Sequence, residues 1–228
     1  MLCSITSQDI FWWLNKSKGR NYDMPVNTTK FYFSGGQLSL DFINTQMGLN
    51  DEVEFLSSFA DLVVWLQQAG ALDSAQAKAA LASWGQRPEA KQLLEQARKL
   101  RNVLRDMAQR LAAGKSIGQG ALDEINHVLA QESGYNQLVR IEGGYEFHFH
   151  PQRREAAHLL TPIAKSAAEL LRDNEPLRIR QCGNPVCTLY YYDTSKNRTR
   201  RWCSMAVCGN RMKAAAFYQR SQKNKRPN

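Results

Sequence analysis

CGNPVC at residues 182–187 and CSMAVC at residues 203–208 place four cysteines in two close pairs near the end of the chain. Each pair has four residues between its cysteines, and fifteen residues separate the two pairs. This spacing is typical of a structural zinc site, in which Cys182, Cys187, Cys203 and Cys208 fill all four tetrahedral positions. A filled coordination shell leaves no place for a catalytic water. The alternative, four buried reduced cysteines, does not explain the symmetry of the spacing.

The positive charge of the chain is concentrated around these cysteines. Residues 178–228 contain twelve Lys or Arg and a single acidic residue, Asp193, a balance of +11. The rest of the chain has a balance of −2, and the whole chain +9. Such asymmetry indicates a polyanionic partner, usually nucleic acid. A basic tail that only aids solubility is the alternative.

The residues between and after the cysteines predict a compact finger. Strands are expected over 177–181 and 189–192, with a tight turn at Gly183, Asn184 and Pro185. A helix is expected from Ser204 onward, with Cys208 in its first turn, where the helix dipole favours a thiolate. A knuckle, a hairpin and a helix carrying the last ligand form a small treble-clef-like zinc finger.

Upstream of the finger, apolar residues recur mostly at helical spacing. The expected helices cover 38–47, 57–70, 73–84, 88–114, a segment carrying Leu122 to Leu129, and 155–172. Pro88 fits the first turn of its helix, and Pro162 either kinks the last helix or begins its second half. The fold class predicted is therefore mainly α with one β-hairpin (α+β), followed by the finger.

The hairpin is expected where the hydrophobic period changes to two, at 139–141 and 145–149. A three-residue loop from Glu142 to Gly144 would pair Ile141 with Tyr145 and put the apolar side chains on one face. A two-residue Gly143-Gly144 loop would split them between the faces. We therefore expect the three-residue loop.

Three segments follow from these patterns. Residues 1–30 show no clear period and are expected to be a disordered extension, with Met24 a candidate functional start. Residues 31–177 form a mainly helical domain, and residues 178–228 form the finger with its basic tail.

Composition excludes several classes of protein. Hydrophobic residues make up 43% of the chain, enough for a core. No apolar run approaches the roughly 20 residues of a membrane span, so no membrane contact is expected. No signal peptide is evident, nor any sign of export to a compartment where disulfides form, so a cytoplasmic protein is expected. No P-loop, Rossmann glycine pattern, HExxH or Gly-x-Ser-x-Gly motif occurs, so no enzymatic activity is expected.

Motifs in the finger and near residue 40 resemble those of a known family. Trp202-Cys203-Ser204-Met205 followed by Cys208-Gly209-Asn210-Arg211 is similar to the CGNR zinc finger, and Asp193-Thr194-Ser195 with Arg198 also fits. GQLSLDFINT at 36–45 resembles the opening of the ABATE domain, which precedes this finger in bacterial stress-induced transcription regulators. The resemblance covers about residues 31–224 and implies a DNA-binding finger joined to a helical domain that senses a ligand. Tyr190 to Tyr192 depart from the aliphatic residues and Phe more usual there.

Two further sets of residues are candidate sites. The nucleic-acid contacts expected, mainly to phosphates of double-stranded DNA, are Arg198, Arg200, Arg201, Asn210, Arg211, Lys213, Arg220 and Lys223, with Asn210 or Arg211 reaching a base edge. A solvated basic face is the alternative. The candidate ligand pocket for a small-molecule effector consists of Asp41, Asn44, Arg101 and Asn126, for which buried hydrogen bonding and helix caps are the more usual explanation. Trp202 is expected to shield the sulfurs, and His148 with His150 to lie on an exposed sheet face.

The sequence thus favours a zinc-dependent DNA-binding regulator. An RNA-binding module and a protein-interaction adaptor with a purely structural finger remain the alternatives, since a basic treble clef suits either nucleic acid.

Overall fold

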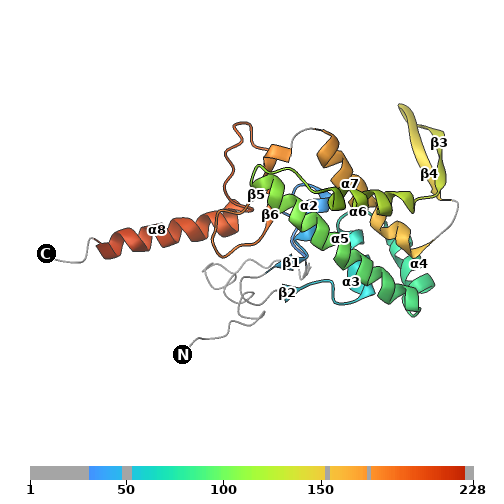
Figure 1. Ribbon diagram of the computed structural model, residues 1–228, viewed down its shortest axis with the longest axis horizontal. Helices are drawn as coiled ribbons and strands as arrows, with labels where there is room; N and C mark the ends of the chain where they lie inside the picture. The colour runs from blue at the N-terminus through green and yellow to red at the C-terminus, as the bar shows by residue number, and fades with distance from the viewer. Residues whose placement is uncertain (1–30, 48–52, 152–154, 174–175, 224–228) are drawn as a thin grey trace.

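A computed structural model describes residues 31–47, 53–151, 155–173 and 176–223. The expected N-terminal extension, residues 1–30, and the last residues of the basic tail lie outside this description. Within it, the chain is a helical body from which a β-hairpin and a basic helix project on opposite sides (Figure 1). None of the described helices is both long and apolar enough to span a bilayer.

The helical body is built around one long helix. The helices are α2 (Leu38–Ile43), α3 (Phe59–Gln68), α4 (Ser74–Trp84), α5 (Pro88–Ala112), α6 (Gln119–Ala130), η1 (Ala156–Leu160) and α7 (Thr161–Arg172). The apolar stripe of α5 packs against α2, α3, α6 and η1. This body confirms the mainly helical fold predicted from the periodicity.

Local sequence explains where these helices begin. Ser58 caps α3 and Asp73 caps α4, each by accepting the backbone N–H three residues on. Pro88 lies in the first turn of α5, where its missing N–H costs nothing. Pro162 occupies the same place in α7, directly after a short 3₁₀ segment, so it begins the second half of the predicted helix and does not kink it.

The strands form three antiparallel pairs: β1 (Gln46–Met47) with β2 (Val53–Glu54), β3 (Gly134–Ile141) with β4 (Gly144–Pro151), and β5 (Ile179–Gln181) with β6 (Tyr190–Tyr192). The last two pairs were predicted. The short β1–β2 pair was not, because two-residue strands carry no detectable alternation.

The predicted register of the β3–β4 hairpin is wrong. The loop is Glu142-Gly143, and it pairs Ile141 with Gly144 and Leu138 with Phe147. Gly143 has a φ of 87°, the left-handed conformation that tight two-residue turns require. The prediction assumed that one apolar face is buried, but Leu138, Tyr145 and Phe147 are all more than half exposed, so burial does not fix the register.

The finger packs directly onto the helical body. Ile179 of β5 and Tyr190 of β6 belong to the same buried cluster as the stripe of α5. Asn44, just after α2, donates to the Tyr190 carbonyl at 2.8 Å and accepts the Tyr190 N–H at 3.0 Å. The next side chain, Tyr191, is fully buried in a second cluster around the cysteines. The strand therefore lies between two cores, with Tyr190 packed on one and Tyr191 on the other.

Candidate metal centre and nucleic-acid interface

The four finger cysteines converge on one point. Their Sγ atoms all lie within 4.8 Å of one another, and the Cys187–Cys203 and Cys203–Cys208 sulfur pairs are both 3.7 Å apart. Four thiolates at about 2.3 Å from a tetrahedral zinc would be about 3.8 Å apart. The ligand set predicted from the spacing is therefore brought together with dimensions that fit a metal ion.

The electrostatics of these thiols also fit a cation. Hydrogen bonds with Cys187 and Cys203 lower the pKa of Cys182, while the same contacts raise the pKa values of Cys187 and Cys203. Sulfurs this close cannot all be thiolates unless a positive charge lies among them. A divalent cation would supply that charge and deprotonate its ligands.

Two N–H groups point at the sulfurs. The side-chain amide of Asn184 donates to Cys208 Sγ at 3.4 Å, and the backbone N–H of Cys203 donates to Cys182 Sγ at the same distance. We call the turns of the two cysteine pairs, residues 182–187 and 203–209, the first and second knuckles. Asn184 is only 2% exposed, so its amide is fixed inside the first knuckle. Such donors orient metal ligands and partly neutralise thiolate charge.

Trp202 packs against the buried cluster around the cysteines. A Cβ at Gly183 would lie 3.2 Å from the Trp202 ring, and one at Gly209 would lie 3.1 Å from it. The indole therefore fits against one glycine from each knuckle, where no side chain has room. This contact supports the predicted shielding role and explains why a glycine follows the first cysteine of one pair and the last cysteine of the other.

Cys208 lies in the π-helical turn η3 (Met205–Gly209), which runs directly into helix α8 (Asn210–Lys223). Ser204 caps this turn by accepting the Val207 N–H. The last ligand thus lies at the start of the helix, as predicted.

The only acidic residue of the finger is buried. Asp193 accepts the N–H and hydroxyl of Ser195 at 2.9 and 2.6 Å, and the N–H of Arg200 at 3.1 Å. Burial alone would raise the pKa of this carboxyl, but the hydrogen bonds from Ser195 and Arg200 outweigh it, so the pKa is lowered and the group stays ionised. Asp193 therefore shapes the 193–200 loop and does not offset the basic surface by exposing a carboxylate.

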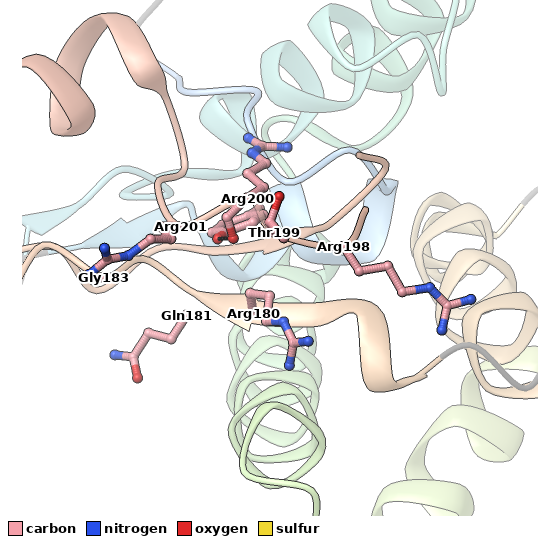
Figure 2. A pocket seen from close by; sticks show the side chains of 8 residues that line it. Arg180, Gln181, Gly183, Arg198, Thr199, Arg200 and Arg201 are labelled. Carbon is pink, nitrogen blue, oxygen red and sulfur yellow. Dashed lines mark hydrogen bonds between the residues drawn. The ribbon is translucent and has the colours of Figure 1, made fainter. Parts of the chain in front are cut away.

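Arg200 turns inward. Its guanidinium donates to the carbonyls of Trp202 (3.0 Å), Ser34 (3.3 Å) and Cys203, and it lies 4.2 Å from the centre of the Tyr191 ring. Figure 2 shows the side chain directed toward the N-terminal segment, away from Arg180 and Arg198. These contacts give Arg200 an internal role, which separates it from the other basic candidates.

The remaining basic candidates lie on the outside of the finger. Arg198, Arg201, Lys213 and Arg220 are exposed, whereas Arg211 is half-buried. Asn210 is exposed, and its side chain donates to the Ala206 carbonyl at 3.1 Å. Lys223 is the last residue of α8.

A shallow cavity of about 340 Å³ lies beside these residues. Arg180, Arg198, Arg200 and Arg201 line it, together with Gln181, Gly183, Tyr191 and Thr199 (Figure 2). Arg180 was not among the predicted site residues. The signal that could have found it is its place on β5 opposite Tyr191, which puts both side chains on one face of the pair.

The predicted pocket residues of the helical body have partners of their own. Asp41 accepts the Gly35 N–H at 2.7 Å, Asn44 holds Tyr190, and Arg101 pairs with Glu54 and donates to the Thr45 hydroxyl. Asn126 is exposed on α6. These contacts match the structural explanation for the first three residues; ligand binding by the set stays a prediction.

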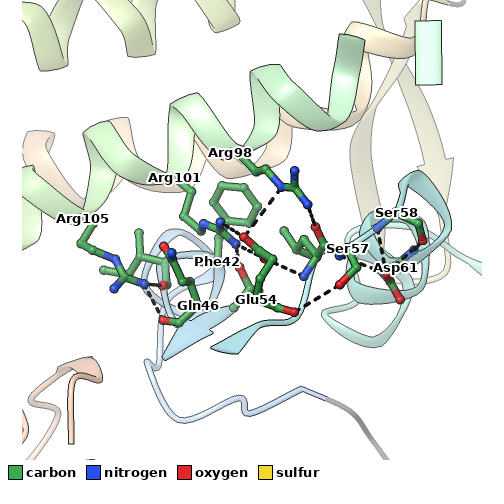
Figure 3. Close-up of polar contacts among 12 residues, drawn as sticks. Phe42, Gln46, Glu54, Ser57, Ser58, Asp61, Arg98, Arg101 and Arg105 are labelled. Atoms are coloured by element: carbon green, nitrogen blue, oxygen red, sulfur yellow. Dashed lines mark hydrogen bonds and ion pairs between the residues drawn. The ribbon is translucent and has the colours of Figure 1, made fainter. Parts of the chain in front are cut away.

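Arg101 belongs to a row of three arginines that was not identified from the sequence. Arg98, Arg101 and Arg105 project from one face of α5 onto the segment around β1 and β2 (Figure 3). Arg98 donates to the Leu56 carbonyl, Arg105 donates to the carbonyls of Ile43 and Gln46, and Glu54 is the counter-ion. Their i, i+3, i+7 spacing was the available signal.

Comparison with known families matches two models to successive parts of the chain. The ABATE family model, described as "Putative stress-induced transcription regulator", matches residues 36–174. The CGNR zinc finger model matches residues 178–221. A search of curated proteins found no match.

Proposed function

Since the chain belongs to the ABATE family and carries a CGNR zinc finger, we propose that it is a zinc-dependent DNA-binding regulator of transcription. The metal is zinc, held by the four cysteines, because four sulfur ligands at tetrahedral spacing are the preferred environment of that ion. Zinc here is structural: it joins the two knuckles and fixes the start of α8.

The observation that carries the proposal is the placement of α8. This helix begins on the second knuckle and projects away from the body, and its residues from Lys213 to Arg220 are all exposed (Figure 1). Among the described elements, η3 is its main contact. No acidic residue occurs from Thr194 to the end of the chain.

An α-helix of this kind fits the major groove of DNA. The groove is about 12 Å wide and admits one helix, and the fourteen residues of α8 extend about 21 Å. A lone helix of this length is marginally stable in water, so a bound surface would complete its folding. Lys213 and Arg220 lie seven residues apart, on one side, and would contact phosphates, while Asn210 or Arg211 would reach a base edge.

The test is a comparison of nucleic acids by fluorescence anisotropy. The zinc-loaded chain is titrated against duplex DNA, single-stranded DNA and duplex RNA of equal length and at one salt concentration. We expect the tightest binding to duplex DNA and its loss when the zinc is chelated. Lys213→Gln and Arg220→Gln should weaken binding, whereas Arg140→Gln, on the hairpin at the other end of the molecule, should not.

Tighter binding to duplex RNA would replace DNA by RNA as the partner. Equal binding by wild type and by both α8 variants would contradict the proposed interface. A genome-wide occupancy map would then test regulation, which requires binding at promoters.

A further inference from the structure

The arginine-lined cavity of the finger is separate from α8 in sequence and has its own chemistry. Its lining contains four arginines, a glutamine and a threonine, and no carboxylate. The one acid nearby, Asp193, is buried, with both carboxylate oxygens held by the loop. The cavity is open to solvent, and its surroundings favour an anion.

The loop that carries Arg198 is held in an unusual conformation. Arg198 has a φ of 53°, and it is the only non-glycine residue with positive φ among the described residues. The Ser195 hydroxyl accepts the Thr199 N–H at 3.1 Å, and the Ser195 carbonyl accepts the Arg198 N–H. Residues other than glycine and asparagine rarely adopt this φ, and such backbone strain is concentrated at functional sites.

The neighbouring arginine is also positioned in advance. The guanidinium of Arg201 lies 5.2 Å from the centre of the Trp202 ring. Arg180 stands opposite Tyr191 in the β5–β6 pair. Arginine side chains that are already oriented lose less entropy when they bind an oxyanion through paired N–H groups.

Trp202 connects this cavity to the start of α8. Its ring packs on Gly183, which lines the cavity, and on Gly209, which directly precedes α8. The two basic surfaces are therefore fixed relative to one another across a single indole ring.

We propose that this cavity is a phosphate site that receives a backbone phosphodiester of the same nucleic acid that α8 binds. Arg180, Arg198 and Arg201 hold the phosphate, and Arg200 keeps the loop in place beneath them. The inference rests on the proposed function and extends it, because the bound strand would run past the metal centre and be gripped on both sides of Trp202. A free phosphate ion has the same chemistry, so the test separates the two sources.

The test measures how Kd for a duplex depends on salt for Arg198→Gly and Arg180→Gln. Glycine adopts positive φ freely, so Arg198→Gly should not destabilise the finger, and its zinc content is the check. Each variant should bind all sequences about tenfold more weakly at 100 mM salt, the loss expected for one charged contact. The salt slope should fall by about 0.9 for each phosphate that the variant no longer neutralises. Between 50 and 200 mM salt, wild type should therefore lose about threefold more affinity than either variant.

Arg140→Gln is the matched control, because it removes the same charge from the far hairpin, and it should leave both quantities unchanged. If Lys213→Gln weakens binding but both cavity variants behave like wild type, the cavity proposal is overturned and the proposed function stands. If all three bind like wild type, the proposed function fails as well.

The second arm adds inorganic phosphate to the zinc-loaded chain and follows the backbone amide signals of residues 198–201 by NMR. We expect these signals to shift with a short duplex at micromolar concentration, and with inorganic phosphate only at concentrations a thousandfold higher. Comparable affinity for inorganic phosphate would overturn the proposal and make the cavity a site for a free anion.

Discussion

Arginines in two regions of this molecule are used in opposite ways. On α5, Arg98, Arg101 and Arg105 turn inward onto backbone carbonyls and Glu54, and Arg101 is only 2% exposed. On the finger, Arg198 and Arg201 face solvent around a cavity that no carboxylate lines. The difference lies in the surroundings, since the α5 row meets the Glu54 carboxylate, whereas the one carboxylate of the finger, Asp193, is buried and held by its own loop. Local surroundings thus separate arginines that hold the fold together from those that are exposed to solvent.

The largest expected effect concerns the metal. Cys203→Ser removes a thiolate from the centre of the finger, so zinc should be lost together with an apparent binding free energy of roughly 10–16 kcal/mol. Zinc analysis and NMR should show a metal-free, disordered finger beside a folded helical body. The α5 arginines need no metal, so signals from α5 should persist; a finger that keeps its folded spectrum without metal would contradict this account.

The next effect tests the inward arginines. Arg101→Met leaves Glu54 without its main partner, so unfolding in urea should show a loss of about 2–4 kcal/mol. The double variant Arg101→Met with Glu54→Met should recover part of this loss. A single variant as stable as wild type would mean that the row contributes little to the fold.

Glu54 and Asp41, both in the helical body, contribute to stability with opposite pH dependences. Burial raises the pKa of Asp41 to about 6, against the hydrogen bond from the Gly35 N–H. A carboxyl with a raised pKa contributes most stability below its unfolded pKa, near 3.9, and that contribution disappears as the pH rises to about 6. For Glu54, burial alone would raise the pKa, but the hydrogen bonds from Arg101 and Leu56 lower it, so its stability is present above pH 4.3 and is lost in acid.

Asp41→Asn separates the two contributions. As the pH rises from 4 to 7, the stability of the variant relative to wild type should increase by about 1–2 kcal/mol, because only the wild type acquires a buried charge. Denaturant unfolding at several pH values measures this difference. A difference that does not change with pH would show that Asp41 remains an ordinary exposed acid.

Arg200 offers the finest comparison, because it lies in the finger but is used like the α5 row. Arg200→Gln should lower the stability of the finger by about 1–2 kcal/mol and leave the salt slope of DNA binding unchanged. Arg201→Gln, one residue later, should leave the stability of the finger unchanged and make the salt slope of DNA binding less steep. Denaturant unfolding and salt titration of both variants provide the check, and identical behaviour would contradict the distinction between inward and outward arginines.

Sequence reasoning predicted the elements that depend on local pattern. The helical stripes, the capping residues and the cysteine spacing are all read over short windows, and they predicted the main helices and the convergence of the four cysteines. The helix expected over 38–47 ends earlier, at Ile43, because Gln46 and Met47 pair as β1. The β3–β4 register failed because the apolar side chains of the hairpin are largely exposed, so its hydrophobic pattern does not indicate which face is buried.

The roles of polar residues depended on contacts between distant parts of the chain. Asn44 meets Tyr190 across 146 residues, and Arg200 meets Ser34 across 166. Neither pairing leaves a local signal. The same reason explains why Arg200 was grouped with the outward arginines and why Asp193, a single acid in a basic segment, gave no sign that it shapes the loop.

We also expect residues 31–177 to fold without the finger, and the structure sharpens the test of this prediction. Ile179 and Tyr190 fill the core beside α5, so a chain ending at residue 177 would expose apolar surface there. Calorimetry of that chain should give a lower melting temperature than the body of the full-length protein.

The central claim is that the metal-bound finger binds duplex DNA through its outward basic residues. The most direct test is the slope of the logarithm of the association constant against the logarithm of the salt concentration, measured for the zinc-loaded, full-length chain. With four to six residues on phosphates, the slope for log affinity should be roughly −4 to −5, and binding should vanish when zinc is removed. A slope near zero, or an equal affinity without zinc, would contradict the claim.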